Sequence, residues 1–408
     1  MKYLAFLVLC AVAFAQPSFF LKPNDTVVFY GDSITDQRLY TTFVETYVVT
    51  RFPKSNITFV HSGWSGDRVT GGGGGPIDLR LRRDVFAYRP TVVTVMLGMN
   101  DGRYRAFDQA IFDEYANGYR SIVKAIKTTL PEARITLIQP SPYDDVTRPP
   151  MFDGGYNSVL QRYGQFLKEL AAKENVFVAD MNTPVIEELK KALALDSANA
   201  TRLIPDRVHP GPGGHWLMAK ALLKAWNAPA TITAVELDAE TKKAVKSENT
   251  VVDGFDGARW TQTDNALPMP LDPKDPLLML AVKSYDTVDS VNQELLKVTG
   301  LESARYKLAI DGETVGTFTK EELAVGISLA TMQTPMMKQA ADVHAMTLRH
   351  NNIHNARWRV LQVPLANDGL PSAQSAMDAL DKLESELVSK QRTAAQPKSH
   401  AYELTPAE

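Results

Sequence analysis

Three side chains in this sequence have the types and the spacing of a nucleophile and its proton-transfer partners. Ser33 stands in the turn Gly31–Ser33, directly after the apolar run Thr26–Tyr30. His209 follows Asp206 by three residues, so the carboxylate can reach one ring nitrogen and leave the other free. A serine, a histidine and a carboxylate in this arrangement can carry out acyl transfer. We therefore expect Ser33 to be the nucleophile, His209 its base and Asp206 the group that orients the imidazole.

Two further blocks offer donors for the oxyanion that acyl transfer generates. Gly66 follows an apolar run at 57–60, and Asn100 follows another at 91–97. If these runs are parallel strands beside the one before Ser33, all three blocks lie on one rim of a sheet. The Ser33 N–H, the Gly66 N–H and the Asn100 amide are then expected to form an oxyanion hole. Such a donor is worth roughly 3–4 kcal/mol in the transition state.

The sequence resembles the SGNH (GDSL-type) esterases and lipases in four blocks that occur in the family's order, namely Gly31–Ser33, Ser65–Asp67, Gly98–Asp101 and Asp206–His209. The resemblance covers about residues 24–228. It implies a three-layer α/β/α sandwich with a flavodoxin-like strand order, and catalysis with neither metal nor cofactor. One position departs from the family pattern, because members often carry Asn where this chain has His61. The departure concerns the local hydrogen bonding of the second block.

Apolar runs alternate with helical patterns over the same part of the chain. The candidate strands are residues 26–30, 57–60, 91–97, 134–139 and 176–180. Apolar residues share one helical face between Phe112 and Ile126 and another between Val159 and Leu170, and Gly213–Trp226 is expected to be a closing helix. Repeated strand–helix units predict a central parallel five-stranded sheet with helices on both faces.

The remaining residues, 230–408, are predicted to form an accessory, mostly β module with two added helices. Asp311–Gly312 separates the strand-like runs 305–310 and 313–318 and predicts a β-hairpin. Helices are expected at about 334–358 and 372–392, and the end from 396 to 408 is expected to be a loose tail.

The start of the chain has the pattern of a secretory signal. Residues 1–15 join a charged start to an apolar run and a small-x-small site, which predicts export to the periplasm or the medium. The predicted divisions are thus 1–15 for the signal, 16–229 for the hydrolase domain and 230–408 for the accessory region. The only cysteine, Cys10, lies in the signal, so we expect no disulfide. A formal charge of −3 does not favour a nucleic-acid partner, and no further apolar stretch predicts a transmembrane segment. The oligomeric state stays open.

Several residues could carry chemistry in other ways. Ser65 lies in a near miss of the Gly-x-Ser-x-Gly turn and is the weaker candidate nucleophile. His215 is expected at the start of the closing helix. His350 and His354 could ligate zinc from one helix face, but with no third ligand evident their packing in a helix is favoured, and no metal is expected.

Three surface features stay without a firm function. The glycine run Gly71–Gly75 beside Gly66 could close over a substrate or could be a plain connector. Asp253–Gly257 resembles a calcium loop only faintly and is expected to be a turn. Four arginines could meet an anionic group near the rim, although solvation is favoured, namely Arg38, Arg68, Arg103 and Arg105.

The sequence therefore predicts a secreted serine ester hydrolase that works through an acyl-enzyme. A small-molecule or polysaccharide ester is the expected partner, and an acetylated carbohydrate is favoured. A lipid or thioester acylhydrolase is the alternative within enzymes. A glycan-binding protein on an inactive scaffold is a third reading, which the presence of Ser33, Asp206 and His209 disfavours.

Overall fold

The computed structural model describes residues 18–284, 291–366 and 368–408. The predicted signal at 1–15 lies outside these residues. Among the described residues, no helix is both long and apolar enough to cross a membrane.

A five-stranded parallel sheet forms the centre of the first half of the chain, as predicted. Its strands, in spatial order, are β2 (Thr58–Gly63), β1 (Thr26–Gly31), β5 (Val92–Met96), β6 (Arg134–Ile138) and β7 (Phe177–Ala179). This is the flavodoxin-like order, with the first strand between the second and the third. The strands are apolar on both faces because helices cover both.

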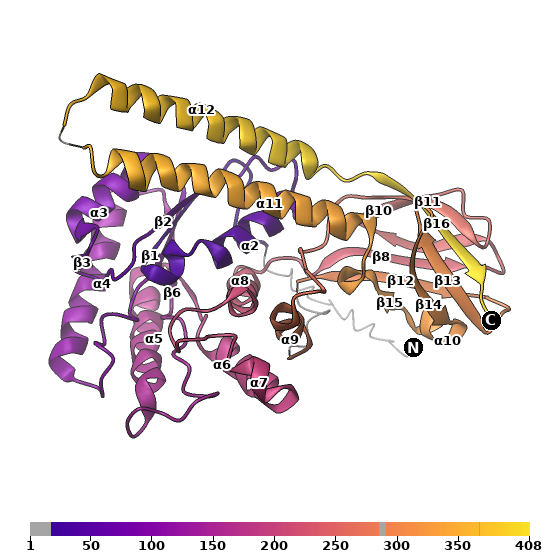
Figure 1. Cartoon of the computed structure of the whole chain (residues 1–408), viewed down its shortest axis with the longest axis horizontal. Helices are drawn as coiled ribbons and strands as arrows, with labels where there is room; N and C mark the ends of the chain where they lie inside the picture. Colours follow the sequence, from indigo (N-terminus) through magenta and orange to yellow (C-terminus); the bar gives the residue numbers. More distant parts are fainter. Residues whose placement is uncertain (1–17, 285–290, 367) are drawn as a thin grey trace, which may run out of the picture.

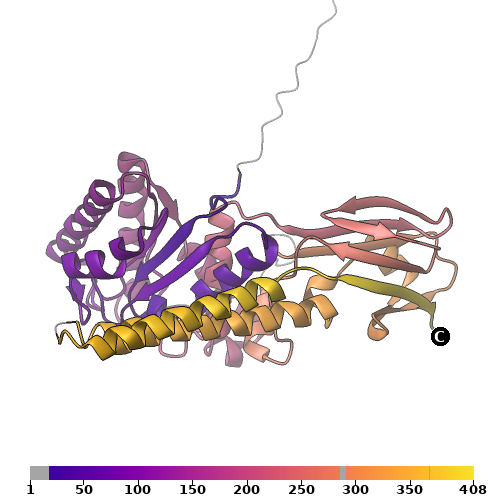
Figure 2. The same cartoon turned by 90° about the horizontal axis from the view of Figure 1, so that it is seen from above.

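Helices α4 (Gln109–Thr129) and α5 (Gly155–Glu174) cover one face of the sheet, and α2 (Leu39–Arg51) and α8 (Pro212–Ala225) cover the other (Figure 2). The predicted faces 112–126 and 159–170 are buried in α4 and α5. Every residue of α2 from Tyr40 onward is buried. A helix buried on all sides must lie between two layers, and a later part of the chain supplies the outer one. The shorter helices are α1 (Ser33–Asp36), α3 (Ile77–Asp84), α6 (Thr183–Leu195) and α7 (Ser197–Ala200).

The accessory region contains two further sheets, so the prediction of a mostly β module with added helices is confirmed. One sheet has the order β10 (Thr250–Asp253), β11 (Arg259–Asp264), β16 (Ser399–Pro406), β13 (Arg305–Ile310), β14 (Glu313–Thr319). The other has the order β15 (Ile327–Ser328), β12 (Gln293–Thr299), β8 (Thr231–Asp238), β9 (Lys243–Glu248). Their apolar faces share one core, which includes Leu237, Leu296 and Leu308. Helices α9 (Pro276–Ser284) and α10 (Lys320–Val325) lie in the loops.

The predicted hairpin around Asp311–Gly312 joins β13 to β14. Both turn residues have positive φ, 52° and 81°, as a tight two-residue hairpin turn requires.

The loose tail predicted at 396–408 is wrong. Residues Ser399–Pro406 form β16, which pairs with β11 on one side and β13 on the other. His400, Tyr402 and Leu404 alternate with more exposed neighbours and point into the module. The alternation of buried and exposed residues in this segment is typical of a strand. The central place of β16 in its sheet depends on partner strands that are far away in the sequence.

The two predicted late helices form a long hairpin that lies across the outside of α2 (Figures 1 and 2). Its parts are α11 (Pro335–Asn355), the π-helical turn η3 (Ala356–Gln362) and α12 (Pro371–Ala394), and we call residues 335–394 the helical hairpin. Thr334 caps α11 by accepting a hydrogen bond from the Met337 N–H. Residues 335–394 thus cover the helical layer of the first half of the chain.

A buried ionic cluster fixes the hairpin on α2. The Glu45 carboxylate of α2 accepts hydrogen bonds from His61 of β2 (3.0 Å) and from His350 of α11 (2.5 Å). Glu384 of α12 lies 3.6 Å from His350 and 3.4 Å from His354. His350 and His354 therefore contact carboxylates, and among the described residues no group of three or more possible ligands could hold a metal ion.

Charge pairing governs ionisation in this cluster. Burial would raise the pKa of Glu45 and lower that of His350, but their mutual attraction outweighs it. The pKa of Glu45 lies well below its usual range, and that of His350 rises to about 10, with Glu384 as its second partner. His350 is therefore a buried cation at neutral pH.

We predict that His350→Gln destabilises the protein by about 3 kcal/mol near pH 6, because it leaves buried carboxylates without their cation. In the unfolded chain the histidine titrates near 6.5. Since the folded pKa is raised to about 10, the proton-linked stabilisation is complete below about pH 6.5 and is lost as the pH rises toward 10. Urea unfolding of the wild-type protein and of His350→Gln measures this. The difference between their free energies of unfolding should be smaller at pH 9.5 than at pH 6.

Arg349→Gln is the matched control, because Arg349 is an exposed cation on the same helix. Its effect should stay within about 0.5 kcal/mol at both pH values. A His350→Gln penalty that is the same at pH 6 and pH 9.5 contradicts the charged pairing.

Candidate active site

Three of the predicted blocks follow neighbouring parallel strands. In the register of the sheet Gly31 of β1 lies beside Gly63 of β2 and Met96 of β5. The chain leaves these strands at the same rim and continues to Ser33, Gly66 and Asn100, respectively. The sheet order therefore places the three blocks together, with Ser33 in the middle.

The turn before Ser33 requires a glycine at position 31. A Cβ atom there would lie 2.2 Å from the Thr35 hydroxyl oxygen and 2.8 Å from the Met96 carbonyl oxygen. Asp32 caps the short helix α1 by accepting from the Ile34 N–H at 3.1 Å. Ser33 is thus the first residue of α1, with its N–H directed out of the helix start.

A continuous chain of hydrogen bonds joins Ser33, His209 and Asp206. The Ser33 hydroxyl donates to His209 Nε2 over 2.8 Å, and His209 Nδ1–H donates to Asp206 Oδ2 over 2.7 Å. The other carboxylate oxygen accepts from the backbone N–H groups of Val208 (2.9 Å) and His209 (2.7 Å). These bonds select the imidazole tautomer whose Nε2 can accept the serine proton.

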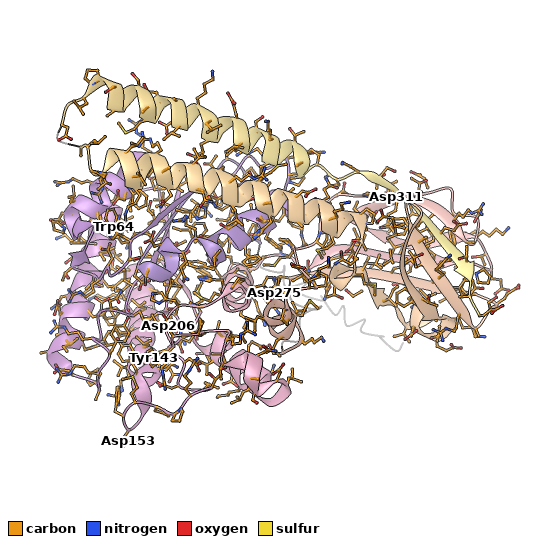
Figure 3. The ribbon with its side chains drawn as sticks, viewed as in Figure 1. Trp64, Tyr143, Asp153, Asp206, Asp275 and Asp311 are labelled. Carbon is orange, nitrogen blue, oxygen red and sulfur yellow. The ribbon has the colours of Figure 1, made fainter. Side chains whose placement is uncertain are left out.

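The site is open to solvent. The side chains of His209 and Asp206 are 38% and 55% exposed. Partial burial raises the pKa of Asp206, but the hydrogen bonds from the His209 backbone and ring outweigh it, so the pKa lies below its usual value. Asp206 is therefore ionised at neutral pH and can stabilise an imidazolium. In Figure 3 the labels of Asp206 and Tyr143 lie close together, and Trp64 lies below the end of α11.

Gly66 presents an unobstructed backbone. Its φ is +80°, and a Cβ atom built there would have no neighbour within 4 Å. Among the described residues the Gly66 N–H has no hydrogen-bond acceptor. Glycine is the residue that adopts this conformation without strain, so the chain leaves one backbone donor free at the rim.

The Asn100 side chain is held by two neighbours. Its Nδ2 donates to the Asp67 carbonyl over 3.1 Å, and its Oδ1 accepts from the Tyr104 hydroxyl over 3.0 Å. These bonds set the orientation of the amide and leave its second N–H available. Together, the free Gly66 donor, the Asn100 amide and the serine N–H can stabilise a negative oxygen formed at Ser33.

Tyr104 is the residue of this site that sequence reasoning missed. Its hydroxyl lies at the site because it donates to Asn100 Oδ1. Partial burial and the charges of Asp32 and Asp206 raise the pKa of Tyr104 to about 12. Arg103 and Tyr104 both have positive φ, 57° and 52°. A tyrosine in a polar loop gives no sequence signal for this role, since the strained turn is visible only in three dimensions.

The weaker candidates lie elsewhere in the hydrogen-bond network. Ser65 donates its hydroxyl to Asp36 Oδ2 over 2.7 Å. His215 lies in the first turn of α8, as predicted, and burial lowers its pKa to about 3. His61 faces α2 and not the rim. Its ring forms hydrogen bonds with Thr41 (2.7 Å) and Glu45 of α2.

The remaining surface features have local explanations. Residues Gly71–Gly72 (β3) and Gly75–Pro76 (β4) form a small hairpin over the Trp64 ring. Asp253–Gly257 is a turn in which Asp256 accepts from the following backbone, as expected. Two of the four arginines pair with carboxylates, Arg38 with Asp36 (3.7 Å) and Arg103 with Glu114 (2.7 Å).

Comparison with known proteins identifies relatives of the hydrolase part and of the whole chain. Residues 29–217 match the GDSL-like Lipase/Acylhydrolase family. An acetylxylan esterase of Geobacillus stearothermophilus is 27% identical over 223 residues, which make up 49% of this chain and 93% of that protein. The structure of BT4096, a gut microbial diltiazem-metabolizing enzyme, aligns with a TM-score of 0.81 at 27% identity and covers 95% of this chain and 98% of that chain. The combination of α/β sheet, β module and helical hairpin therefore occurs in a second protein.

We predict that a fluorophosphonate probe labels Ser33 and no other serine. Among the described residues, Ser33 is the only serine whose hydroxyl lies within hydrogen-bond distance of a histidine nitrogen, and Asp206 orients that histidine. Mass spectrometry of digested, labelled protein locates the adduct. Ser33→Ala should abolish labelling, and Ser65→Ala should leave it unchanged. An adduct on Ser65 would exclude the proposed arrangement.

Proposed function

Because the chain is a carboxylic ester hydrolase of the GDSL (SGNH) type, we propose that Ser33 is its nucleophile and that the reaction passes through an acyl-enzyme. The observation that carries this proposal is the unbroken chain from the Ser33 hydroxyl through His209 to Asp206, with distances of 2.8 and 2.7 Å. No other serine considered for this role contacts a histidine that a carboxylate orients.

The reaction begins as the Ser33 oxygen attacks the ester carbonyl and His209 Nε2 takes the hydroxyl proton. Asp206 holds the ring by its other nitrogen and stabilises the imidazolium. The carbonyl oxygen becomes negative in the tetrahedral intermediate. Collapse of that intermediate expels the alcohol, which receives the proton from His209, and leaves the acyl group on Ser33. A water molecule then repeats the sequence and releases the acid.

The developing oxyanion is assigned to three donors, the N–H groups of Ser33 and Gly66 and the amide of Asn100. Each donor is fixed before the substrate arrives: Ser33 by the start of α1, Gly66 by its turn, and Asn100 by Asp67 and Tyr104. Donors that need no reorganisation stabilise the transition state more than the ground state.

The proposed substrate is an acetylated carbohydrate outside the cell. An exposed His209 and Asp206 allow a bulky alcohol such as a polysaccharide chain to reach the nucleophile. The similarity to an acetylxylan esterase over the hydrolase part supports a small acyl group on a sugar. The export part of this proposal rests on residues 1–15.

A small non-carbohydrate ester is the second candidate. It is favoured by the whole-chain similarity to an enzyme described as metabolizing diltiazem. A lipid or thioester acylhydrolase would need room for a long acyl chain. Two large cavities, of about 630 and 1020 Å³, are lined by residues other than Ser33 and His209.

We predict that acetyl p-nitrophenyl ester is hydrolysed with a higher kcat/KM than the octanoyl ester, and that acetylated xylo-oligosaccharides release acetate. An enzyme that buries a longer acyl chain gains up to about 0.8 kcal/mol for each methylene, so it should show the reverse order. Steady-state kinetics on both esters, on the oligosaccharide and on diltiazem separate the candidates.

Ser33→Ala is the control, with an expected loss of about 10³-fold or more in kcat. Preference for the octanoyl ester would reject the carbohydrate proposal in favour of a lipid substrate. Turnover of diltiazem without acetate release from the oligosaccharide would favour the small-molecule ester.

A further inference from the structure

The end of α11 reaches the loop that carries Gly66. We call Trp64–Asp67 the oxyanion loop. The π-helical turn η3 brings Trp358 and Arg359 against it. The Trp358 ring meets the Trp64 ring edge-on, with 5.7 Å between centroids, and the Arg359 guanidinium carbon lies 3.1 Å from the centroid of the Trp64 ring. Short π-helical segments inside longer helices are rare and occur frequently at functional sites.

Trp358 also enters the polar network beneath this loop. Its indole N–H donates to Asp84 Oδ1 over 2.6 Å. Asp84 is fully buried and pairs with the equally buried Arg80. Arg80 in turn donates to Asp67 Oδ2 over 2.6 Å and to the Ser62 carbonyl over 2.9 Å. A path of buried hydrogen bonds therefore runs from Trp358 through Asp84 and Arg80 to the oxyanion loop.

Asp67 connects this path to both loop-borne donors. It follows Gly66 directly in the chain, and its carbonyl accepts from the Asn100 amide over 3.1 Å. On its other side the loop is tied to α1, because Asp36 accepts from the Ser65 N–H at 3.2 Å and from its hydroxyl at 2.7 Å. A displacement of Asp67 would thus move the Gly66 N–H and the Asn100 N–H together.

We propose that the C-terminal helical hairpin is a working part of the active site, and that Trp358, with Arg359, is a positioning residue for the oxyanion donors. Trp358 touches no reacting atom in this account. It fixes the Asp84–Arg80–Asp67 network, and Arg359 covers the outer face of Trp64. The inference rests on the proposed function, because it assigns the oxyanion to Gly66 and Asn100.

Three effects support a role in rate rather than in ground-state binding. An oxyanion exists only in the transition state, so misplaced donors lower kcat and leave KM nearly unchanged. Buried charged networks tolerate the loss of one partner poorly. Within the part of the chain that the structure describes, the hydrogen bonds of Trp358 and Arg80 go to Asp84, Asp67 and Ser62, and none goes to His209.

The test is Trp358→Phe, which keeps an aromatic ring against Trp64 but removes the fused five-membered ring with the N–H that Asp84 accepts. Its kcat for acetyl p-nitrophenyl ester should fall about 10-fold with little change in KM, which is about the effect of weakening one charge-assisted hydrogen bond. The matched control is Trp260→Phe in the β module, which also removes a buried indole N–H, here donated to Gln262 over 3.2 Å. Trp260→Phe should keep the wild-type kcat.

Coupling to the oxyanion donors is measured by a double-mutant cycle. In an Asn100→Ala background the effect of Trp358→Phe on kcat should shrink, since one of the two donors that it positions is gone. Arg359→Gln is the second variant, and it leaves the hydrogen bond from Trp358 to Asp84 in place. It should lower kcat about threefold because it exposes the Trp64 ring. Thermal melts confirm that each variant is folded at the assay temperature.

Equal kcat in Trp358→Phe and Trp260→Phe overturns the inference, as does a full effect of Trp358→Phe in the Asn100→Ala background. These results are distinct from a failure of the proposed function. In that case the wild-type protein would show neither ester hydrolysis nor labelling at Ser33.

Discussion

The buried guanidinium of Arg80 is the interaction on which the catalytic rim depends. It lies between the carboxylates of Asp67 and Asp84 and has no exposed atom, so the segments that carry these three side chains must stay together. The burial of Arg80 also explains why the segment Gly71–Gly75 consists of glycines. A Cβ atom at Gly74 would lie 2.5 Å from the Arg80 side chain and 2.6 Å from the Trp64 ring, so the small β3–β4 hairpin can cover the cation only without side chains there. Glycines at this place serve close packing.

Two buried polar clusters join the end of the chain to its beginning. The Glu45–His350 pair holds α11 on α2, and the Trp358–Asp84 bond holds η3 beneath the oxyanion loop. Between them the hairpin covers the outer face of α2, where Thr42, Glu45 and Thr46 form hydrogen bonds with side chains of α11. The helical hairpin is therefore a structural partner of the hydrolase fold, although it begins more than a hundred residues after residue 229.

The features that could be predicted from the sequence are those encoded locally. Strand–helix alternation predicts the parallel sheet, and the Ser33, Gly66 and Asn100 blocks follow strands that prove to be neighbours. The Asp206–His209 pair is local as well. Contacts that depend on the three-dimensional fold could not be predicted. Tyr104 orients Asn100 from a strained loop, and Trp358 donates to Asp84, which lies 274 positions earlier in the sequence. β16 pairs with β11 and β13, which both precede it by many residues. Pairwise contacts of this kind leave no periodicity in the sequence.

Three donors at neighbouring strand ends are proposed to stabilise an oxyanion formed at Ser33, and steady-state kinetics of Asn100→Ala measure the contribution of one of them. Asn100 lies in a loop, so its replacement should cost little stability. We expect kcat to fall by about 10²–10³-fold while KM stays nearly constant. Asn100→Asp should be at least as harmful, since it puts a negative charge before the oxyanion. A kcat near the wild-type value in folded Asn100→Ala would contradict the claim.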